Sequence, residues 1–288
     1  MKRIVVLMHH CRRLRHTYYL IDALSEAWRQ KGLRVSCVYG LNHCPKADLV
    51  IPHIDLTRTP PEYNNYIRSL PSVINRDVLD ISKRASATHL LLGDEDYRGP
   101  VIVKTDTNSH GRQEYRLFRC RHPLLARVQR KAVPVAERAL GHRLAWRTVL
   151  HEYRIYDSLA DVPSGAFANP ALVIQRFLPE REGDRYFVRH YLCLGDASRS
   201  VRVAASTPLL KRVSCVLVDE DLPVPDQVLS LRRRLRLDYG KIDYTIHAGE
   251  VAILDVNRTP GVPGPPEATA RTVADLADGI WSLMPNGR

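Results

Sequence analysis

The segment 241–261, KIDYTIHAGEVAILDVNRTPG, restricts the fold of this chain more than any other. Apolar and polar side chains alternate over 241–247 and again over 251–257, which is typical of two half-buried strands. Residues 248–250 lie between them, and Gly249 can adopt the left-handed conformation that a three-residue hairpin loop requires. The segment therefore predicts an antiparallel hairpin.

A three-residue loop in this hairpin would align apolar residues with one another on one face. The aligned pairs would be Ile242–Val256, Tyr244–Leu254 and Ile246–Ala252. On the other face, Asp243 would lie opposite Asp255. A two-residue loop would instead bring Asp243 opposite Leu254 and mix the two faces, so the pattern favours the three-residue loop.

Asp255 and Asn257 are two residues apart on one strand, so they point to the same face. The facing carboxylates of Asp243 and Asp255 repel each other unless a cation lies between them. Carboxylate and amide oxygens are the ligands that Mg²⁺ prefers, which predicts a magnesium site at these three residues. The alternative is an Asx turn ahead of Pro260-Gly261. This short stretch does not exclude either interpretation.

The chain has 288 residues, which suggests about two or three compact units. We expect an N-terminal domain at 1–72, a central unit at 73–170 and a C-terminal unit at 171–288. The first should be α/β with parallel strands, because strands and one helix alternate in its sequence. These elements are expected at 3–8, 17–31 (a helix capped by Thr17), 34–39 and 48–53.

The central unit is expected to begin with a helix that Asp80 caps and that runs through Leu92. Pro134 lies in a basic, helix-rich stretch at 123–150. Strands are expected at 101–104, 171–178, 186–194 and 199–205, and a helix at 226–237 precedes the hairpin.

The net charge of +12 suggests polyanionic partners. Arginines are densest at 12–15 and 232–236. In the second cluster, Val228, Leu231 and Leu235 form an apolar stripe, so the arginines should lie on a solvated helix face. Aromatic residues do not interleave with basic ones as in single-strand binders. Nucleic acid is therefore disfavoured as a partner.

The apolar run at 4–8 is shorter than the roughly 7 to 15 residues of a secretory signal. No run approaches the roughly 20 residues that span a bilayer, so we expect no membrane segment. The six cysteines (11, 37, 44, 120, 193 and 215) form no Cys-x-x-Cys pair. Scattered cysteines indicate reduced thiols and a cytoplasmic location. A zinc site at His9–Cys11 with His43-Cys44 is disfavoured, because the spacing fits no usual pattern.

Magnesium held by few protein oxygens takes its other ligands from water and phosphates. Lys104 ends an apolar strand and precedes a polar loop that closes at His110-Gly111. Lys83 lies in the first turn of a predicted helix, where anions are attracted. Both lysines are candidates to hold phosphates, although a lysine at the end of a strand is also common on a protein surface.

The strand at 172–178 changes into a charged segment. Its backbone could carry adenine, with Phe177 and Leu178 against the ring. Glu180 or Glu182 could then accept ribose hydroxyls. The alternative is a solvated turn.

Taken in order, these pieces resemble the ATP-grasp superfamily over roughly residues 73–262. The most specific match is 241–261, with an Asp on one strand and an acid-x-Asn before Pro-Gly on the next. Glutathione synthetase, D-alanine–D-alanine ligase and the glutamate ligases are relatives at this level. The resemblance implies an α/β ATP-grasp fold behind a small α/β domain, with ATP and Mg²⁺ bound.

The resemblance also assigns roles to individual residues. Asp243, Asp255 and Asn257 correspond to the magnesium ligands. Arg189 and Arg202 are expected to be catalytic, on adjacent strands near the transferred phosphate. The residues expected to bind ATP are Lys83, Lys104, His110, Gly111, Gln175, Arg176, Phe177, Leu178 and Glu182. Two departures from the family are that Asp255 stands where Glu is frequent, and that the loop 105–111 is poor in glycine, which leaves its closure over ATP open.

The usual chemistry of the family is amide formation, in which ATP phosphorylates a carboxylate and an amine attacks the acyl phosphate. We therefore expect a carboxylate–amine ligase that acts on a small metabolite or peptide. The alternatives are an ATP-grasp kinase of a hydroxyl group and a non-catalytic protein that binds nucleic acid. Arg12, Arg13 and Arg258 are candidates for the carboxylate of the substrate, since the first two follow the carboxyl end of a parallel strand. The sequence leaves a homodimer open.

Overall fold

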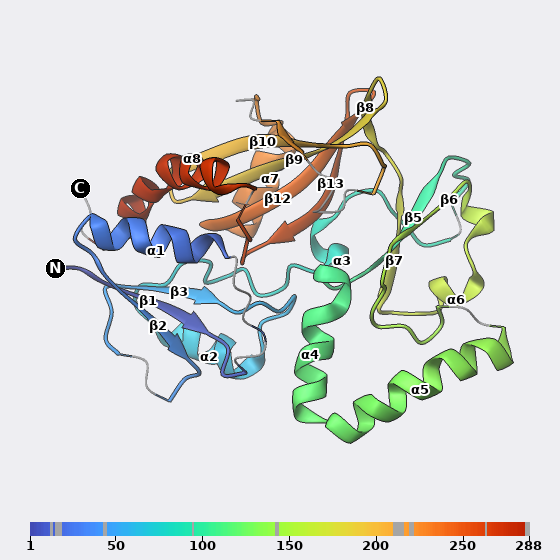
Figure 1. Cartoon of the computed structure of the whole chain (residues 1–288), viewed down its shortest axis with the longest axis horizontal. Helices are drawn as coiled ribbons and strands as arrows, with labels where there is room; N and C mark the ends of the chain where they lie inside the picture. Colours follow the sequence, from blue (N-terminus) through green and yellow to red (C-terminus); the bar gives the residue numbers. More distant parts are fainter. Residues whose placement is uncertain are drawn as a thin grey trace.

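The computed structural model describes residues 1–11, 14, 19–42, 45–93, 95–141, 144–209, 216–218, 222–262 and 264–285. Its strands form three sheets that follow one another along the long axis of the molecule (Figure 1). Thr17, Arg12 and Arg13 lie outside the described residues. No helix in the described ranges combines the length and the apolar composition needed to cross a membrane.

The N-terminal sheet is parallel, with the order β2-β1-β3. Its elements are β1 (Arg3–Met8), α1 (Leu20–Gln30), β2 (Arg34–Tyr39), β3 (Leu49–His53) and α2 (Pro61–Ser69). The apolar strand β1 lies between the other two strands, and its last five residues are buried. The predicted parallel α/β opening is confirmed, although the first helix begins at Leu20.

The central sheet is antiparallel, with the order β4-β7-β5-β6. The strands are β4 (Leu90–Leu91), β5 (Val101–Thr105), β6 (Arg154–Tyr156) and β7 (Leu172–Arg176). The helical elements are α3 (Lys83–Ser86), η2 (Ser109–Gly111), α4 (Arg112–Arg121), α5 (Pro123–Leu140), η3 (Leu159–Asp161) and α6 (Ser164–Phe167). Since β7 pairs with β4 and β5, this sheet continues past the boundary expected at 170.

The expected helix from Asp80 to Leu92 is wrong. Ala87 is already extended, with ψ 155°, and Leu90–Leu91 pairs with β7. The Asp80 carboxylate accepts the Ser82 N–H at 2.8 Å in a local turn instead of capping a helix. Hydrogen bonding to a neighbouring strand therefore overrides the local helical pattern, and only the short helix α3 remains.

The C-terminal sheet has the order β11-β10-β9-β12-β13, and β8 pairs with β9. Its strands are β8 (Glu180–Glu182), β9 (Arg185–Leu194), β10 (Ala197–Ala205), β11 (Val216–Val218), β12 (Tyr239–His247) and β13 (Glu250–Asn257). The helices are α7 (Asp226–Leu235), α8 (Pro266–Leu276) and η5 (Ala277–Leu283).

The β12–β13 hairpin confirms the predicted pairing of Asp243 with Asp255, but it reaches this pairing by another route. The loop has two residues, Ala248 and Gly249, with φ values of 49° and 84°. The register then shifts beyond Tyr244, which pairs with Ile253. Leu254 is the extra residue of a β-bulge. The three-residue loop was wrong, and the bulge supplies the one-residue offset that this loop was expected to provide.

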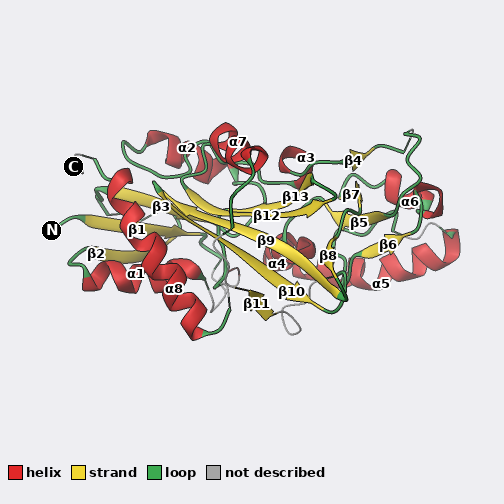
Figure 2. Cartoon of the chain, turned by 90° about the horizontal axis from the view of Figure 1, so that it is seen from above, coloured by secondary structure: helices red, strands yellow, loops and turns green. Residues whose placement is uncertain are grey.

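The N-terminal unit and the C-terminal sheet share one hydrophobic core. Helices α1 and α8 lie side by side against it (Figure 2). The Trp28 indole is fully buried and donates to the Ala277 carbonyl at 2.9 Å. Tyr19 also bridges to Gly261, directly after the hairpin. This packing places the carboxyl end of β13 beside the N-terminal unit.

Candidate nucleotide and metal site

A cavity of about 760 Å³ lies between the central and C-terminal sheets. Its walls come from β5 and β7 on one side and from β9, β12 and β13 on the other. The predicted residues that line it are Lys83, Lys104, His110, Gln175, Arg176, Phe177, Leu178, Asp243 and Asp255. Most of the predicted nucleotide and metal residues are thus brought together.

Asp243 lies on the cavity face of β12 and has two basic side chains beside it, although burial lowers the pKa of His190. His190 Nδ1 is 2.6 Å from its Oδ1 and Lys241 Nζ is 2.9 Å from the same atom. Burial opposes the charge of the carboxylate, but Lys241 and His190 outweigh it and hold the pKa of Asp243 below its usual range. Asp243 is therefore an ionised carboxylate at neutral pH.

Asp255 pairs with Asp243 across the hairpin, yet its surroundings differ. Its nearest cation is Lys83, whose Nζ lies 3.6 Å from Oδ1. This oxygen is buried without a hydrogen-bond partner among the described residues. Burial raises the pKa of Asp255. A buried carboxylate oxygen that lacks a partner beside a second carboxylate fits a hard divalent cation.

Asn257 does not complete a three-ligand set. Its Oδ1 accepts the Thr259 N–H at 2.8 Å and the Thr259 hydroxyl at 3.2 Å, so the Asx-turn alternative describes this residue. It does not belong to the cavity lining. The described residues also contain no cluster of three or more His, Cys, Asp or Glu side chains able to hold a metal. A cation here would rest on Asp243, Asp255 and ligands from outside the protein.

Lys83 and Lys104 are both buried lysines that face the cavity. Lys83 Nζ donates to the Thr107 carbonyl at 3.1 Å. Burial disfavours its charge, but the neighbouring carboxylates, Asp255 first among them, raise the pKa of Lys83. For Lys104, burial dominates and lowers the pKa to about 7. The two lysines therefore differ in how well the protein itself supports their charge.

Gln175 was expected in the adenine-binding segment, but it supports Lys104. The side chain is fully buried, and its Oε1 accepts from Lys104 Nζ at 2.7 Å. Its amide nitrogen donates to the Thr88 carbonyl at 2.7 Å and to the Ile253 carbonyl at 2.9 Å. Gln175 thereby connects the central sheet to β13 and orients Lys104.

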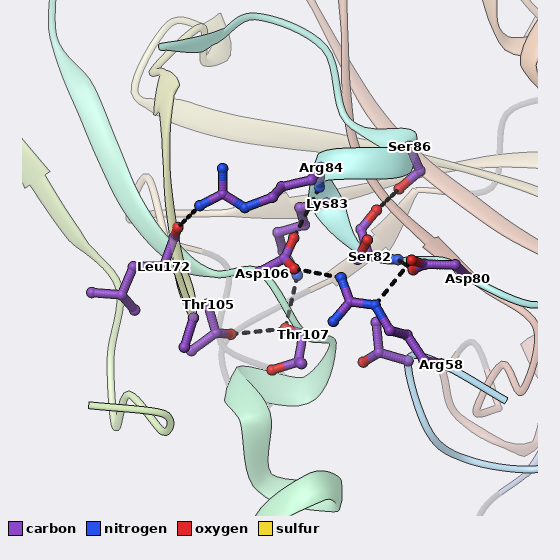
Figure 3. Close-up of polar contacts among 12 residues, drawn as sticks. Arg58, Asp80, Ser82, Lys83, Arg84, Ser86, Thr105, Asp106, Thr107 and Leu172 are labelled. Atoms are coloured by element: carbon purple, nitrogen blue, oxygen red, sulfur yellow. Dashed lines mark hydrogen bonds and ion pairs between the residues drawn. The ribbon is translucent and has the colours of Figure 1, made fainter. Parts of the chain in front are cut away.

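A polar network around Asp106 positions Lys83 (Figure 3). The Asp106 carboxylate accepts the Arg84 N–H at 3.0 Å and Arg58 Nη2 at 2.9 Å. Its carbonyl accepts the Lys83 N–H at 2.9 Å. Arg58 also reaches Asp80 at 2.9 Å. Sequence reasoning missed Asp106 and Arg58, because neither belongs to a motif, and only the fold brings residue 58 beside residue 106.

The loop that closes at Gly111 has an unusual backbone. Ser109, His110 and Gly111 all have positive φ, at 51°, 60° and 76°. A Cβ on Gly111 would lie 2.2 Å from the Thr148 carbonyl oxygen, so this position requires glycine. His110 faces the cavity with its ring 4.2 Å from that of Tyr153. Burial lowers the pKa of His110 to about 4.

The segment 176–178 forms the apolar end of the cavity. The Arg176 guanidinium lies 4.8 Å from the ring centre of Tyr97. The Phe177 N–H donates to the Pro100 carbonyl at 2.8 Å, whereas the Leu178 N–H has no partner within the described part of the chain. Leu178 therefore offers a backbone donor beside an apolar wall.

Arg189 and Arg202, the expected catalytic arginines, do not face the cavity. The alternation of β9 directs Val188 and His190 into it, while Arg189 pairs with Tyr244 of the opposite face. Arg189 binds Glu180 through contacts of 2.8 to 2.9 Å. This geometry corrects the expectation, and His190 occupies the position foreseen for Arg189.

Arg202 lies on the same far face as Arg189. It ion-pairs with Glu182 and stacks 4.1 Å above the ring of Phe187. The Glu182 side chain is 58% exposed, and Glu182 is not among the residues that line the cavity. The ribose role expected for Glu182 therefore has no geometric support.

Arg258, expected to meet the substrate, is a buried structural residue. It is 3% exposed and donates to the Val78 carbonyl and, at 2.7 Å, to the Leu56 carbonyl. Burial lowers its pKa to about 10. Arg258 thus joins the end of β13 to the N-terminal unit. The other two substrate candidates, Arg12 and Arg13, lie outside the described residues.

Several residues of the cavity escaped sequence reasoning, and His190 and Lys241 are the two beside Asp243. Lys241 is two residues from Asp243, so the alternation of β12 was a sufficient signal for it. His190 could not be found in this way, because Arg189 and His190 are neighbouring basic residues and the sequence does not say which of them faces the cavity.

No protein-family model matches the chain, and neither does any curated protein. Solved structures do. A RimK domain ATP-grasp protein from Sphaerobacter thermophilus is 13% identical, with 96% of this chain and 99% of that chain covered and a TM-score of 0.50. The ATP-grasp ligase PsnB complexed with its minimal precursor is 10% identical, with 96% and 100% covered and a TM-score of 0.53.

A second PsnB structure, with a phosphomimetic variant of the minimal precursor, Mg and ADP, is 11% identical, with 98% of this chain and 99% of that chain covered and a TM-score of 0.53. At these identities the likeness concerns the fold. Its near-complete coverage includes the N-terminal unit and both sheets around the cavity. Together with the observed strand order, these likenesses identify the chain as a protein of the ATP-grasp fold.

Proposed function

We propose that this protein is an ATP-dependent ligase that joins a carboxylate to an amine through an acyl phosphate. The observation that carries the proposal is the buried Asp255 oxygen without a hydrogen-bond partner, opposite Asp243 and beside Lys83. This arrangement of charges is incomplete without a cation and an anion. Mg²⁺ and a polyphosphate together supply both.

Asp243 and Asp255 would hold the metal. Bound there, Mg²⁺ would neutralise phosphate charge and polarise the phosphoryl group that is transferred. The two carboxylates come from paired strands, so their spacing is set by the hairpin and requires no loop to close. Lys241 already neutralises part of the charge of Asp243, and the His190 ring is within hydrogen-bond distance of the same oxygen. Asp255 is thus the carboxylate with the greater need of a cation.

Lys83 and Lys104 would contact the phosphates. Lys104 is the more telling of the two, because burial lowers its pKa to about 7. An anion beside it would restore the charged form. Gln175 holds the ammonium group in place at 2.7 Å. The energy needed to keep this charge buried would then come from the bound nucleotide.

The apolar end of the cavity would receive the base. Phe177 and Leu178 supply apolar contact there, and the Leu178 N–H is a backbone donor available to a ring nitrogen. At the other end, His110 and Tyr153 form a wall over Lys83. A wall of this kind would keep water from an acyl phosphate, which hydrolyses readily.

The test is an assay of ADP release, in the presence of Mg²⁺, across a panel of carboxylates and amines. Hydroxylamine is added to trap any acyl phosphate as a hydroxamate. A ligase releases ADP only with a suitable carboxylate and yields the hydroxamate. ADP release with a phosphorylated alcohol and without hydroxamate would instead identify the alternative, a kinase. The matched control is Asp255→Asn, which removes one charge from the site at nearly constant volume.

A further inference from the structure

Two cysteine side chains that are 109 positions apart in the sequence meet where α4 contacts the N-terminal unit. The Sγ atoms of Cys11 and Cys120 are 3.1 Å apart. Neither residue is in a disulfide, and both are half-buried. A disulfide requires a sulfur–sulfur distance of about 2.05 Å, so the atoms need to approach by only about 1 Å.

The position of Cys11 is held by the loop that follows β1. His10 donates its backbone N–H to the Tyr63 hydroxyl of α2 at 2.7 Å. The His9 ring stacks 5.1 Å from the ring of Tyr63, and His9 Nδ1 accepts the Cys11 N–H at 3.0 Å. The Cys11 backbone is therefore anchored independently of Cys120.

The position of Cys120 is held by α4. Gln113 in the first turn donates to Asp55 and, at 3.1 Å, to the Leu14 carbonyl. The Glu114 carboxylate accepts the Thr57 N–H at 2.8 Å, and Leu117 packs against the core of the N-terminal unit. The helix thus lies along that unit over its whole length, and its last turn brings Cys120 to Cys11.

The pair differs in exposure from the other described cysteines. Cys120 lies between Arg119 and Arg121 in the sequence, and Arg121 Nη2 lies 3.6 Å from Glu62 at the start of α2. The thiolate is the species that attacks a disulfide, so a thiol must be within reach of the oxidant to react. By contrast, Cys193 is fully buried and burial raises its pKa to about 11. Cys37 is exposed.

We propose that Cys11 and Cys120 are a redox-active pair that forms a reversible disulfide tying α4 to the N-terminal unit. The oxidant is a low-molecular-weight disulfide. One thiolate attacks it, forms a mixed disulfide and releases one small thiolate. The second protein thiolate then attacks the protein sulfur of the mixed disulfide and releases the second small thiolate. Two electrons pass from the protein pair to the oxidant.

The disulfide would lie at the end of a helix whose beginning adjoins the cavity. Helix α4 begins at Arg112, directly after the strained residues 109–111 whose His110 lines the cavity. Tying the helix to the N-terminal unit restrains that loop. We therefore expect slower ATP turnover in the oxidised protein, a consequence that rests on the proposed function. Formation of the disulfide itself does not depend on that function.

The experiment incubates the full-length protein with oxidised glutathione and measures its intact mass without reduction. The pair predicts loss of two hydrogens with no retained glutathione at these two sites. It also predicts a tryptic peptide ending at Arg12 joined to the dipeptide Cys120-Arg121. Dithiothreitol should reverse both changes. In Cys120→Ser, a stable glutathione adduct on Cys11 should replace the link, whereas Cys37→Ser should leave the link unchanged.

Separate glutathione adducts on Cys11 and Cys120 in the wild-type protein, with no linked peptide, would overturn the proposal. Unreactive thiols at both positions would overturn it equally. Circular dichroism of each serine variant shows whether it is folded, and the mass measurement needs no activity. ADP release by oxidised and reduced protein then tests the effect on the cavity. A linked protein with unchanged turnover would refute the restraint while leaving the pair established.

Discussion

Two carboxylates, Glu180 on the far face of the C-terminal sheet and Asp255 on its cavity face, differ in how far their hydrogen bonds are complete. On the far face, Glu180 accepts Arg189 Nε and Nη2 at 2.8 to 2.9 Å and the Ile246 N–H at 3.0 Å. On the cavity face, Asp255 has a buried oxygen without a hydrogen-bond partner among the described residues. Across the cavity, on β5 of the central sheet, burial also lowers the pKa of Lys104 to about 7.

The difference separates ionic groups that stabilise the fold from ionic groups that are ready to bind. A ligand adds little stabilisation to a buried charge whose hydrogen bonds are already complete. A ligand stabilises a buried charge much more when that charge still lacks a hydrogen-bond partner. Groups with perturbed pKa values of this kind gather at functional sites. Substitutions on the far face should therefore change stability, whereas those on the cavity face should change ligand binding and turnover.

The largest effect is expected for Asp255→Asn. Turnover of ATP with Mg²⁺ should fall by at least about 1000-fold, because one of the two metal-binding carboxylates is lost. The melting temperature of the metal-free protein should rise, since burial disfavours the charge of Asp255. Steady-state ADP release and thermal denaturation check the two parts. Wild-type turnover in the variant would remove Asp255 from the metal site.

Arg189→Ala should be the most damaging change on the far face. It leaves Glu180 buried without its main partner, which should cost about 3 kcal/mol of unfolding free energy. Urea denaturation measures this loss, and Arg181→Ala, an exposed neighbour on β8, is the control. The Kd for ATP should be unchanged while the variant is folded. A selective loss of ATP affinity at full stability would return Arg189 to the active site.

Lys83→Ala and Lys104→Ala should weaken ATP binding by roughly ten- to a hundred-fold, as expected for charge-assisted contacts. AMP binding should change less, because both lysines are assigned to the outer phosphates. Calorimetric titration with each nucleotide measures the difference, and Lys31→Ala, an exposed lysine directly after α1, is the control. Equal losses for ATP and AMP would mean that the lysines act through folding.

The smallest effect concerns pH. Burial lowers the pKa of Lys104 to about 7 in the free protein, and a bound phosphate should raise it. Well below pH 7, Lys104 is already protonated before the nucleotide binds, so the affinity for ATP is highest there. Above pH 7, binding must take up a proton, so affinity should fall by up to about tenfold per pH unit. Calorimetry in buffers of different ionisation enthalpy detects this proton, and Lys104→Arg should abolish it.

Much of the site follows from local pattern. Alternation over β12 and β13 predicts a hairpin, and the need to segregate apolar from acidic side chains predicts Asp243 opposite Asp255. The predicted pairing is confirmed although the predicted loop length is wrong, because the β-bulge at Leu254 restores the register. The parallel α/β opening and the cavity-facing lysines likewise follow from short segments that can be read residue by residue.

The rest depends on packing between distant segments. Both faces of β9 are covered and both carry basic side chains, so its alternation alone does not show that Arg189 points outward and His190 inward. Only the pairing with β12 decides this. From the sequence, Asn257 is expected to bind metal and Arg258 to bind substrate. In the structure, the Asn257 side chain accepts a hydrogen bond within a turn, and the Arg258 guanidinium donates to the carbonyls of Leu56 and Val78. The Asp106–Arg58 contact and the meeting of Cys11 with Cys120 likewise need the folded chain. The functional group of a side chain is given by the sequence. The partner that binds this group is decided by residues that lie far away in the sequence and are brought close by the fold.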